Sequence, residues 1–138
     1  MKKLGRHLIA EYSDCSVERL NDAAFLERSM LEAVRKSGAT IVDSVFHRYA
    51  PQGVSGVVVI AESHMSIHTW PEYGYAAVDF FTCGQTVDPV RAYEYLKQQL
   101  QSQSGSVTEV DRGIPSDTNV ILSHKPAKTA HGVTTAAR

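Results

Sequence analysis

Residues 57–61 read VVVIA, a continuous apolar run in which four of the five residues are β-branched. Such side chains suit the pleated surface of a sheet, so the run predicts a strand, and its lack of polar residues predicts a strand covered on both faces. The segment that follows, ESHMSIHTWPE at 62–72, holds two His, two Ser, two Glu and one Trp. Because a rigid sheet fixes the side chains at the ends of its strands, we expect reactive groups here.

The segments that flank this run predict further strands and two helices. Apolar residues recur every three or four positions between 21 and 36, and Gly38 follows, so a helix is expected there. Pro89 stands where the first turn of a helix tolerates proline, which predicts a second helix over 89–100. The other expected strands cover 6–12, 40–49, 75–82 and 106–112.

These elements follow one another in the order β-α-β-β-β-α-β. Short connections between neighbouring strands favour antiparallel pairing, with both helices on one side. The expected fold class is therefore α+β: a mainly antiparallel β-sheet with two helices packed on one face, an αβ-sandwich. We expect a single domain over 1–112 and a mobile C-terminal tail over 113–138, in which 120–122 is the only apolar cluster.

Composition excludes several classes of protein. The chain has 138 residues with a net charge of −1, so it lacks the basic surplus typical of a protein that binds nucleic acid. No apolar run approaches the roughly 20 residues that span a bilayer, and the start does not resemble a secretory signal, so we expect a cytoplasmic protein with no membrane partner. Cys15 and Cys83 are the only cysteines, too few for a disulfide scaffold.

The residue types in and after 62–72 leave three interpretations open. His64, His68 and Cys83 could form a zinc site, although the glutamate of an HExxH motif is missing. Serine or cysteine together with histidine could form a hydrolase, although no GxSxG motif is present. The side chains could also be no more than hydrogen-bonded polar groups at a strand turn.

A resemblance to a known family bears on these alternatives. The segment ESHMSIHTWPE at 62–72 closely resembles the processing site of the prokaryotic-type S-adenosylmethionine decarboxylase proenzymes. The similarity continues through GRH at 5–7, VFH at 45–47, PQGVSGVVVIAE at 51–62, GYAAVD at 74–79 and FTCG at 81–84. It covers about residues 4–112, in order and without evident gaps.

The resemblance implies an inactive precursor that cleaves its own backbone between Glu62 and Ser63. The products would be a β chain of residues 1–62 and an α chain of residues 63–138, the latter beginning with a pyruvoyl group made from Ser63. That group is the implied cofactor: it forms a Schiff base with the substrate and takes the place of pyridoxal phosphate, with no metal. The catalytic domain is then expected to be 1–112.

Further roles are implied residue by residue. His68 matches the family's proton acceptor in processing, which suits an imidazole that is neutral near pH 7. Ser55 matches a serine that hydrogen-bonds the tetrahedral intermediate of the acyl shift. Cys83 matches the proton donor in decarboxylation. Glu72 is expected to bind ribose hydroxyls, and Tyr49, which stands where the family commonly has Phe, to stack on adenine.

The implied activity is decarboxylation of S-adenosylmethionine for spermidine biosynthesis. The resemblance also implies a homodimer of processed αβ protomers, whose active sites draw residues from both subunits, so that Tyr49 and Glu72 could serve the Ser63 of a partner subunit. Two alternatives remain: a pyruvoyl-dependent arginine or ornithine decarboxylase of the same fold, and a non-catalytic regulatory homologue that has kept the fold.

Overall fold

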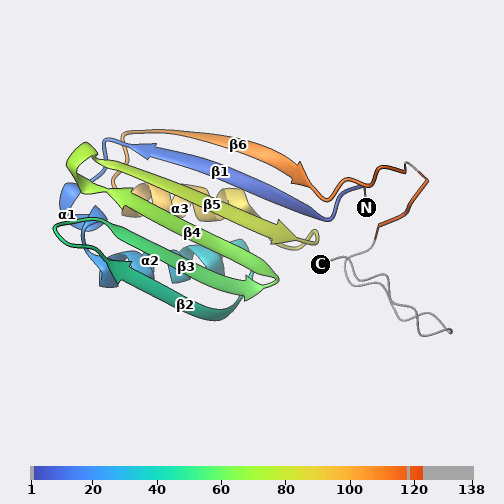
Figure 1. The fold of residues 1–138 in the computed structure, drawn as a ribbon, viewed down its shortest axis with the longest axis horizontal. Coiled ribbons are helices and arrows are strands. Elements are labelled where there is room, and N and C mark those ends of the chain that lie inside the picture. The colour runs from blue at the N-terminus through green and yellow to red at the C-terminus, as the bar shows by residue number, and fades with distance from the viewer. Residues whose placement is uncertain (1, 118, 123–138) are drawn as a thin grey trace.

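The computed structural model describes residues 2–117 and 119–122 of the chain. These residues form six strands, three α-helices and one short 3-10 helix (Figure 1). The strands are β1 (Gly5–Ser13), β2 (Thr40–Arg48), β3 (Val54–Ala61), β4 (Ser63–Trp70), β5 (Tyr75–Cys83) and β6 (Ser104–Arg112). The helices are α1 (Val17–Leu20), α2 (Ala23–Ser37) and α3 (Pro89–Gln99), and η1 covers Pro71–Tyr73.

All six strands form one antiparallel sheet in the order β2-β3-β4-β5-β1-β6. Helices α2 and α3 lie together behind this sheet, and the opposite side carries no helix among the described residues (Figure 1). The predicted α+β class, with a mainly antiparallel sheet and two helices on one face, is confirmed. We call the side without helices the open face.

Local signals account for both long helices. The Asp22 side chain caps α2 by accepting a hydrogen bond from the backbone N–H of Phe25 at 3.0 Å, and Gly38 ends the helix at a φ of 89°, a conformation in which glycine has no Cβ to clash. Asp88 caps α3 in the same way, ahead of Pro89. The apolar faces of these helices meet β3, β4 and β5 in a core that includes the fully buried Leu26, Met30, Leu96, Val58, Ile67 and Phe80.

The expectation that 57–61 is covered on both faces is wrong. Val58 and Ile60 are buried under the helices, whereas Val59 is 41% exposed on the open face. Successive side chains of a strand point to opposite faces, so helices on one side bury every second residue only. The sequence does not show this alternation, because β-branched residues occupy both the positions under the helices and those on the open face.

The strand β4 and the short helix α1 were not predicted. In β4, Met65, Ile67 and Thr69 are buried, and they alternate with more exposed polar residues that include His68. This is the period of two that is typical of a half-buried strand. From the sequence, the polar half of this pattern indicates a reactive segment that follows a strand. In the structure these polar residues lie within a strand of their own.

Two further expectations concern the C-terminal tail and membrane-spanning segments. The predicted tail over 113–138 lies mostly outside the described residues, which end at 122. Within the described residues, no helix is long and apolar enough to cross a membrane.

Candidate active site

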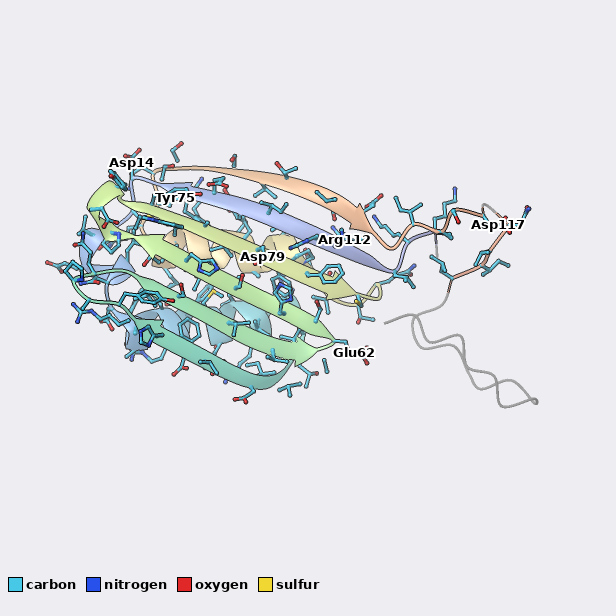
Figure 2. All side chains as sticks on the ribbon, in the orientation of Figure 1. Asp14, Glu62, Tyr75, Asp79, Arg112 and Asp117 are labelled. Carbon is cyan, nitrogen blue, oxygen red and sulfur yellow. The ribbon has the colours of Figure 1, made fainter. Side chains whose placement is uncertain are left out.

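The link between β3 and β4 is the most unusual piece of backbone in the predicted site. Ile60 pairs with Ser63, so only Ala61 and Glu62 form the turn of this hairpin, and Figure 2 shows Glu62 at its tip. Ser63 has a φ of 120°, a value that residues with a Cβ rarely adopt because of steric clashes. Strained backbone of this kind costs about 1–3 kcal/mol and is concentrated at functional sites. The Glu62-Ser63 bond therefore lies at a strained, partly exposed turn.

Cys83 lies at the same end of the sheet. It ends β5, and its chain neighbour Thr82 pairs with Ser63 across the β4–β5 ladder. Partial burial raises the pKa of the Cys83 thiol above its usual value, and the nearby Glu62 carboxylate raises it further. A thiol with a raised pKa keeps its proton at neutral pH, which suits a group that must donate one. We call Glu62, Ser63, Thr82 and Cys83 the turn end of the site.

Ser55 and His68 lie together at the other end of β3 and β4. They are directly opposite each other in the β3–β4 ladder, and Ser55 Oγ is 2.8 Å from His68 Nδ1, which makes a hydrogen bond. Both side chains are on the open face, beside a groove of about 510 Å³ that they line together with His47 and Ser66. This pairing joins the two residues expected to act on the processing intermediate.

Tyr49 and Glu72 lie at this second end as well. Tyr49 follows β2, is 48% exposed, and packs its ring edge-on against His47 with the centroids 4.6 Å apart. Glu72 lies in η1, directly after β4, and accepts a hydrogen bond of 2.6 Å from the Gln52 side chain. We call Ser55, His68, Tyr49 and Glu72 the histidine end.

The predicted residues thus form two groups that do not meet in one chain. Ser63 and His68 are five residues apart in β4, which is about 16 Å at the rise of a strand. Alternation also gives residues at an odd spacing to opposite faces of a regular strand. Ser63 and His68 of one chain are therefore too far apart for a direct proton transfer, which requires roughly 3 Å.

A polar network that sequence reasoning did not assign fills the centre of the open face between the two ends. His7 Nε2 lies 2.6 Å from Asp79 Oδ2, and His64 Nε2 lies 3.1 Å from the same oxygen. Ser66 donates to the other carboxylate oxygen, and Arg112 donates to His7 Nδ1 at 2.8 Å. Figure 2 shows Asp79 in the middle of this face and Arg112 toward the end of β6. The alternation of β1, β4 and β5 could have placed these residues on one face, but only the register brings them together.

The network holds Asp79 as a carboxylate. Partial burial by itself would raise the Asp79 pKa, but the hydrogen bonds from Ser66, His7 and His64 outweigh it, and the resulting pKa is below the usual value. Hydrogen bonds to the charged form of a group favour that form.

This cluster also offers three possible metal ligands, because the donor atoms of His7, His64 and Asp79 lie within 4.8 Å of one another. The Arg112 contact argues against this use. An arginine can only donate, so neutral His7 must carry its proton on Nε2, the atom that would have to bind the ion. The zinc set considered from sequence, which also needs His68 and Cys83, is divided between the two ends of the sheet. Hydrogen bonding describes the cluster better than metal binding.

The fold and the site together define an αβ-sandwich protein whose candidate chemistry lies on the open face and at one strained hairpin of an antiparallel sheet. Comparison with known sequences identifies the particular family. A sequence model described as S-adenosylmethionine decarboxylase matches residues 6–113, and the chain belongs to this family.

Individual relatives agree with this assignment. The chain is 61% identical, over 82% of its length and 87% of the relative's, to a protein of Thermosipho melanesiensis named S-adenosylmethionine decarboxylase proenzyme. A protein of the same name from Thermotoga petrophila is 58% identical over the same shares of the two chains. Among solved structures, the adenosylmethionine decarboxylase of Aquifex aeolicus matches with a TM-score of 0.78 and 33% identity, over 85% of this chain and 97% of that one.

Proposed function

We propose that this chain is a self-processing, pyruvoyl-dependent decarboxylase that converts S-adenosylmethionine to its decarboxylated form and carbon dioxide, for spermidine biosynthesis. Membership of the family supports the activity, and relatives that are 58% and 61% identical over 82% of the chain are named as proenzymes. The observation that supports self-processing is Ser63 itself, held at a φ of 120° directly after a two-residue turn. We place the catalytic domain at 1–112 and the break between Glu62 and Ser63.

Processing begins with a shift of the acyl group from nitrogen to oxygen. Ser63 Oγ attacks the carbonyl carbon of Glu62, the C–N bond breaks, and the hydroxyl proton ends on the freed nitrogen, so an ester replaces the amide. Serine is a weak nucleophile, and the strained turn lowers the cost of leaving the amide geometry. Ser55 would hydrogen-bond the tetrahedral intermediate, as a donor placed for developing oxyanion charge.

The second stage breaks the ester. A base, His68 in this proposal, removes the Cα proton of Ser63. The electron pair expels the Glu62 carboxylate from Cβ, which releases residues 1–62 and leaves dehydroalanine. Water then hydrolyses the imine tautomer, which yields ammonia and the pyruvoyl group at residue 63. When formed, this group supplies an electron sink for loss of carbon dioxide. The raised pKa of Cys83 keeps a proton on its sulfur. Cys83 would donate this proton to the substrate carbon from which carbon dioxide has left.

The two ends of the site come together if two chains share it. We propose a homodimer in which the turn end of one protomer meets the histidine end of its partner. A two-fold axis then builds two equivalent sites. The open face supports such packing because it exposes apolar side chains, among them Val45 at 63% and Val59 at 41%. In this arrangement Tyr49 and Glu72 bind the adenosine part of a substrate held at the other subunit's residue 63.

Co-expression of two defective chains tests the shared site. Neither Ser63→Ala nor His68→Ala should cleave efficiently alone. In a mixed dimer, one site receives both defects and the other receives neither, so the chain that carries His68→Ala should be cut. Intact mass spectrometry distinguishes the two chains. If no His68→Ala chain is cut in the mixture, while each variant still dimerises, the shared-site proposal is wrong.

The activity itself is tested in two measurements. Intact mass of the purified protein should show two chains divided between Glu62 and Ser63, the second with a blocked N-terminus. Release of carbon dioxide should then be faster from S-adenosylmethionine than from arginine or ornithine. A permanently uncut chain would favour the regulatory homologue, and a preference for arginine or ornithine would overturn the substrate assignment.

A further inference from the structure

Thr82 has a buried hydroxyl group that makes no hydrogen bond. The residue is 1% exposed, and its Oγ1 is the only buried side-chain nitrogen or oxygen without a partner in the described part of the chain. Leaving such a group unpaired costs about 1–3 kcal/mol by mutational estimates. Valine has nearly the same shape and would avoid that cost, so packing alone does not explain why threonine stands here.

The position of Thr82 suggests what its hydroxyl is for. Ser63 is its direct neighbour across the β4–β5 ladder, and the Cβ atoms of directly opposed residues lie about 4.5–5.5 Å apart in antiparallel pairs. Two hydroxyl groups can span that gap once their rotamers turn toward each other. The unpaired group is thus beside the residue that the proposed reaction consumes, and next in sequence to Cys83.

We propose that Thr82 is a positioning residue for self-processing: its hydroxyl oxygen accepts a hydrogen bond from the Oγ–H of Ser63. This inference rests on the function proposed above. The bond would turn a lone pair of Ser63 Oγ toward the carbonyl carbon of Glu62. Thr82 does not take up the proton, which still passes to the nitrogen of the broken amide. Its contribution is to reduce the rotamers that the nucleophile samples before attack.

A second buried threonine serves as a matched control. Thr69 in β4 is 7% exposed, but its hydroxyl donates to the Leu20 carbonyl at 2.7 Å and accepts from the Val54 N–H at 2.9 Å. Its role is therefore structural. Replacing the hydroxyl by a methyl group should lower stability at Thr69. At Thr82 it removes no hydrogen bond that the structure shows, and in a Ser63→Ala chain the proposed donor is also gone.

The experiment compares Thr82→Val, Thr82→Ser and Thr69→Val. Cleavage of the full-length chain is followed by intact mass after a pulse of cell-free synthesis. Unfolding by denaturant is measured for the same changes in the uncut Ser63→Ala background. We expect Thr82→Val to slow cleavage about tenfold, the effect of one hydrogen bond of about 1.4 kcal/mol, without a lower unfolding midpoint. Thr82→Ser should restore most of the rate, and Thr69→Val should lower the midpoint.

Three results would refute the positioning role of Thr82 or the function on which it rests. If Thr82→Val is cut at the wild-type rate, or if Thr82→Ser is as slow as Thr82→Val, the positioning role is wrong. If Thr82→Val lowers the midpoint as much as Thr69→Val does, the hydroxyl has a structural partner and the inference also fails. Failure of the wild-type chain to be cut would refute the proposed function, and this inference with it.

Discussion

The turn end and the histidine end of the site differ in how complete they are. At the histidine end, Ser55 and His68 already share a hydrogen bond of 2.8 Å on an exposed surface beside a groove. At the turn end, Ser63 is in a strained conformation and Thr82 has a buried hydroxyl with no partner in the described chain. One end is chemically satisfied and open, and the other is strained and unsatisfied.

This difference indicates that the precursor is strained at the proposed cleavage site but lacks the acid-base group there until two chains assemble. Strain and an unpaired hydroxyl raise the free energy of the precursor at the bond to be broken, which favours the step that relieves them. The acid-base partner is kept about 16 Å away along the same strand, so a single chain cannot use it. Processing would then depend on assembly, because only a second copy brings a histidine end to the turn end.

The largest expected effect is on cleavage, from removal of the base. His68→Ala should slow the break between Glu62 and Ser63 at least about 100-fold, since general acid-base groups typically contribute 10²–10⁴-fold. Hydroxylamine should cleave any ester that accumulates between Glu62 and Ser63, and the masses of the resulting fragments measure how much ester had formed. His47→Ala is the matched control, because His47 lies on the same face and lines the same groove. Equal rates in the two variants would show that the histidine end has no special role.

Cys83→Ala is expected to separate the two activities of the turn end. The chain should still be cut, at least in part, because the thiol is proposed to act only after the pyruvoyl group exists. Decarboxylation should fall about 100-fold, at the lower bound for loss of a general acid. Carbon dioxide release per cleaved chain is the quantity to measure. Cys15→Ala, which removes the other cysteine, should leave it near the wild-type value. A full rate in Cys83→Ala would remove this residue from the mechanism.

Much of the fold could be predicted because its signals are local. Both long helices begin at capping aspartates and end where expected, within a few residues of the predicted limits 21–36 and 89–100. The strand β4 was missed for a physical reason: its open-face residues are the polar ones that attract a functional interpretation. Which face the helices cover depends on tertiary packing, and the VVVIA run carries no polar residue to mark it.

The members of the candidate site come from local similarity and stay predictions, whereas their arrangement comes from the structure. Ser63, His68 and Cys83 follow from the resemblance, but the separation of the first two follows from strand geometry, which the sequence does not predict for 63–70. The bond from His7 to Asp79 joins residues 72 positions apart and depends on the register of two strands. The missing partner of Thr82 is a property of packing alone, since no sequence pattern reports an unfilled hydrogen bond.

The network between the two ends predicts a pH-dependent stability. The folded-state pKa of Asp79 is below the usual value of an aspartate. The contribution of Asp79 to stability is therefore fully present well above that usual value and is lost as the pH falls through the folded pKa. Asp79→Asn should therefore lower the free energy of unfolding by about 2 kcal/mol at pH 7, the scale of hydrogen bonds to a charged group.

The difference between Asp79→Asn and wild type should shrink as the pH drops below about 4. Denaturant titrations of the two proteins at a series of pH values measure it. Asp43→Asn is the control, because within the described chain this exposed carboxylate on β2 accepts a hydrogen bond only from the neighbouring Ser44 N–H. A constant difference across the range would mean that the Asp79 charge does not stabilise the sheet.

The smallest expected effect tests whether Glu62 and Cys83 form one electrostatic unit. The Glu62 carboxylate raises the pKa of the Cys83 thiol, although burial contributes more. In an uncut Ser63→Ala, Cys15→Ala background, Cys83 is the only thiol, and its rate of alkylation by iodoacetamide reports the thiolate fraction at each pH. Glu62→Gln removes the negative charge, so the alkylation curve should move to lower pH. Glu32→Gln makes the same chemical change at a partly exposed position on α2, behind the sheet, and should leave the curve in place. If both variants shift the curve equally, the effect of Glu62→Gln is one of net charge and Glu62 and Cys83 are not an electrostatic unit.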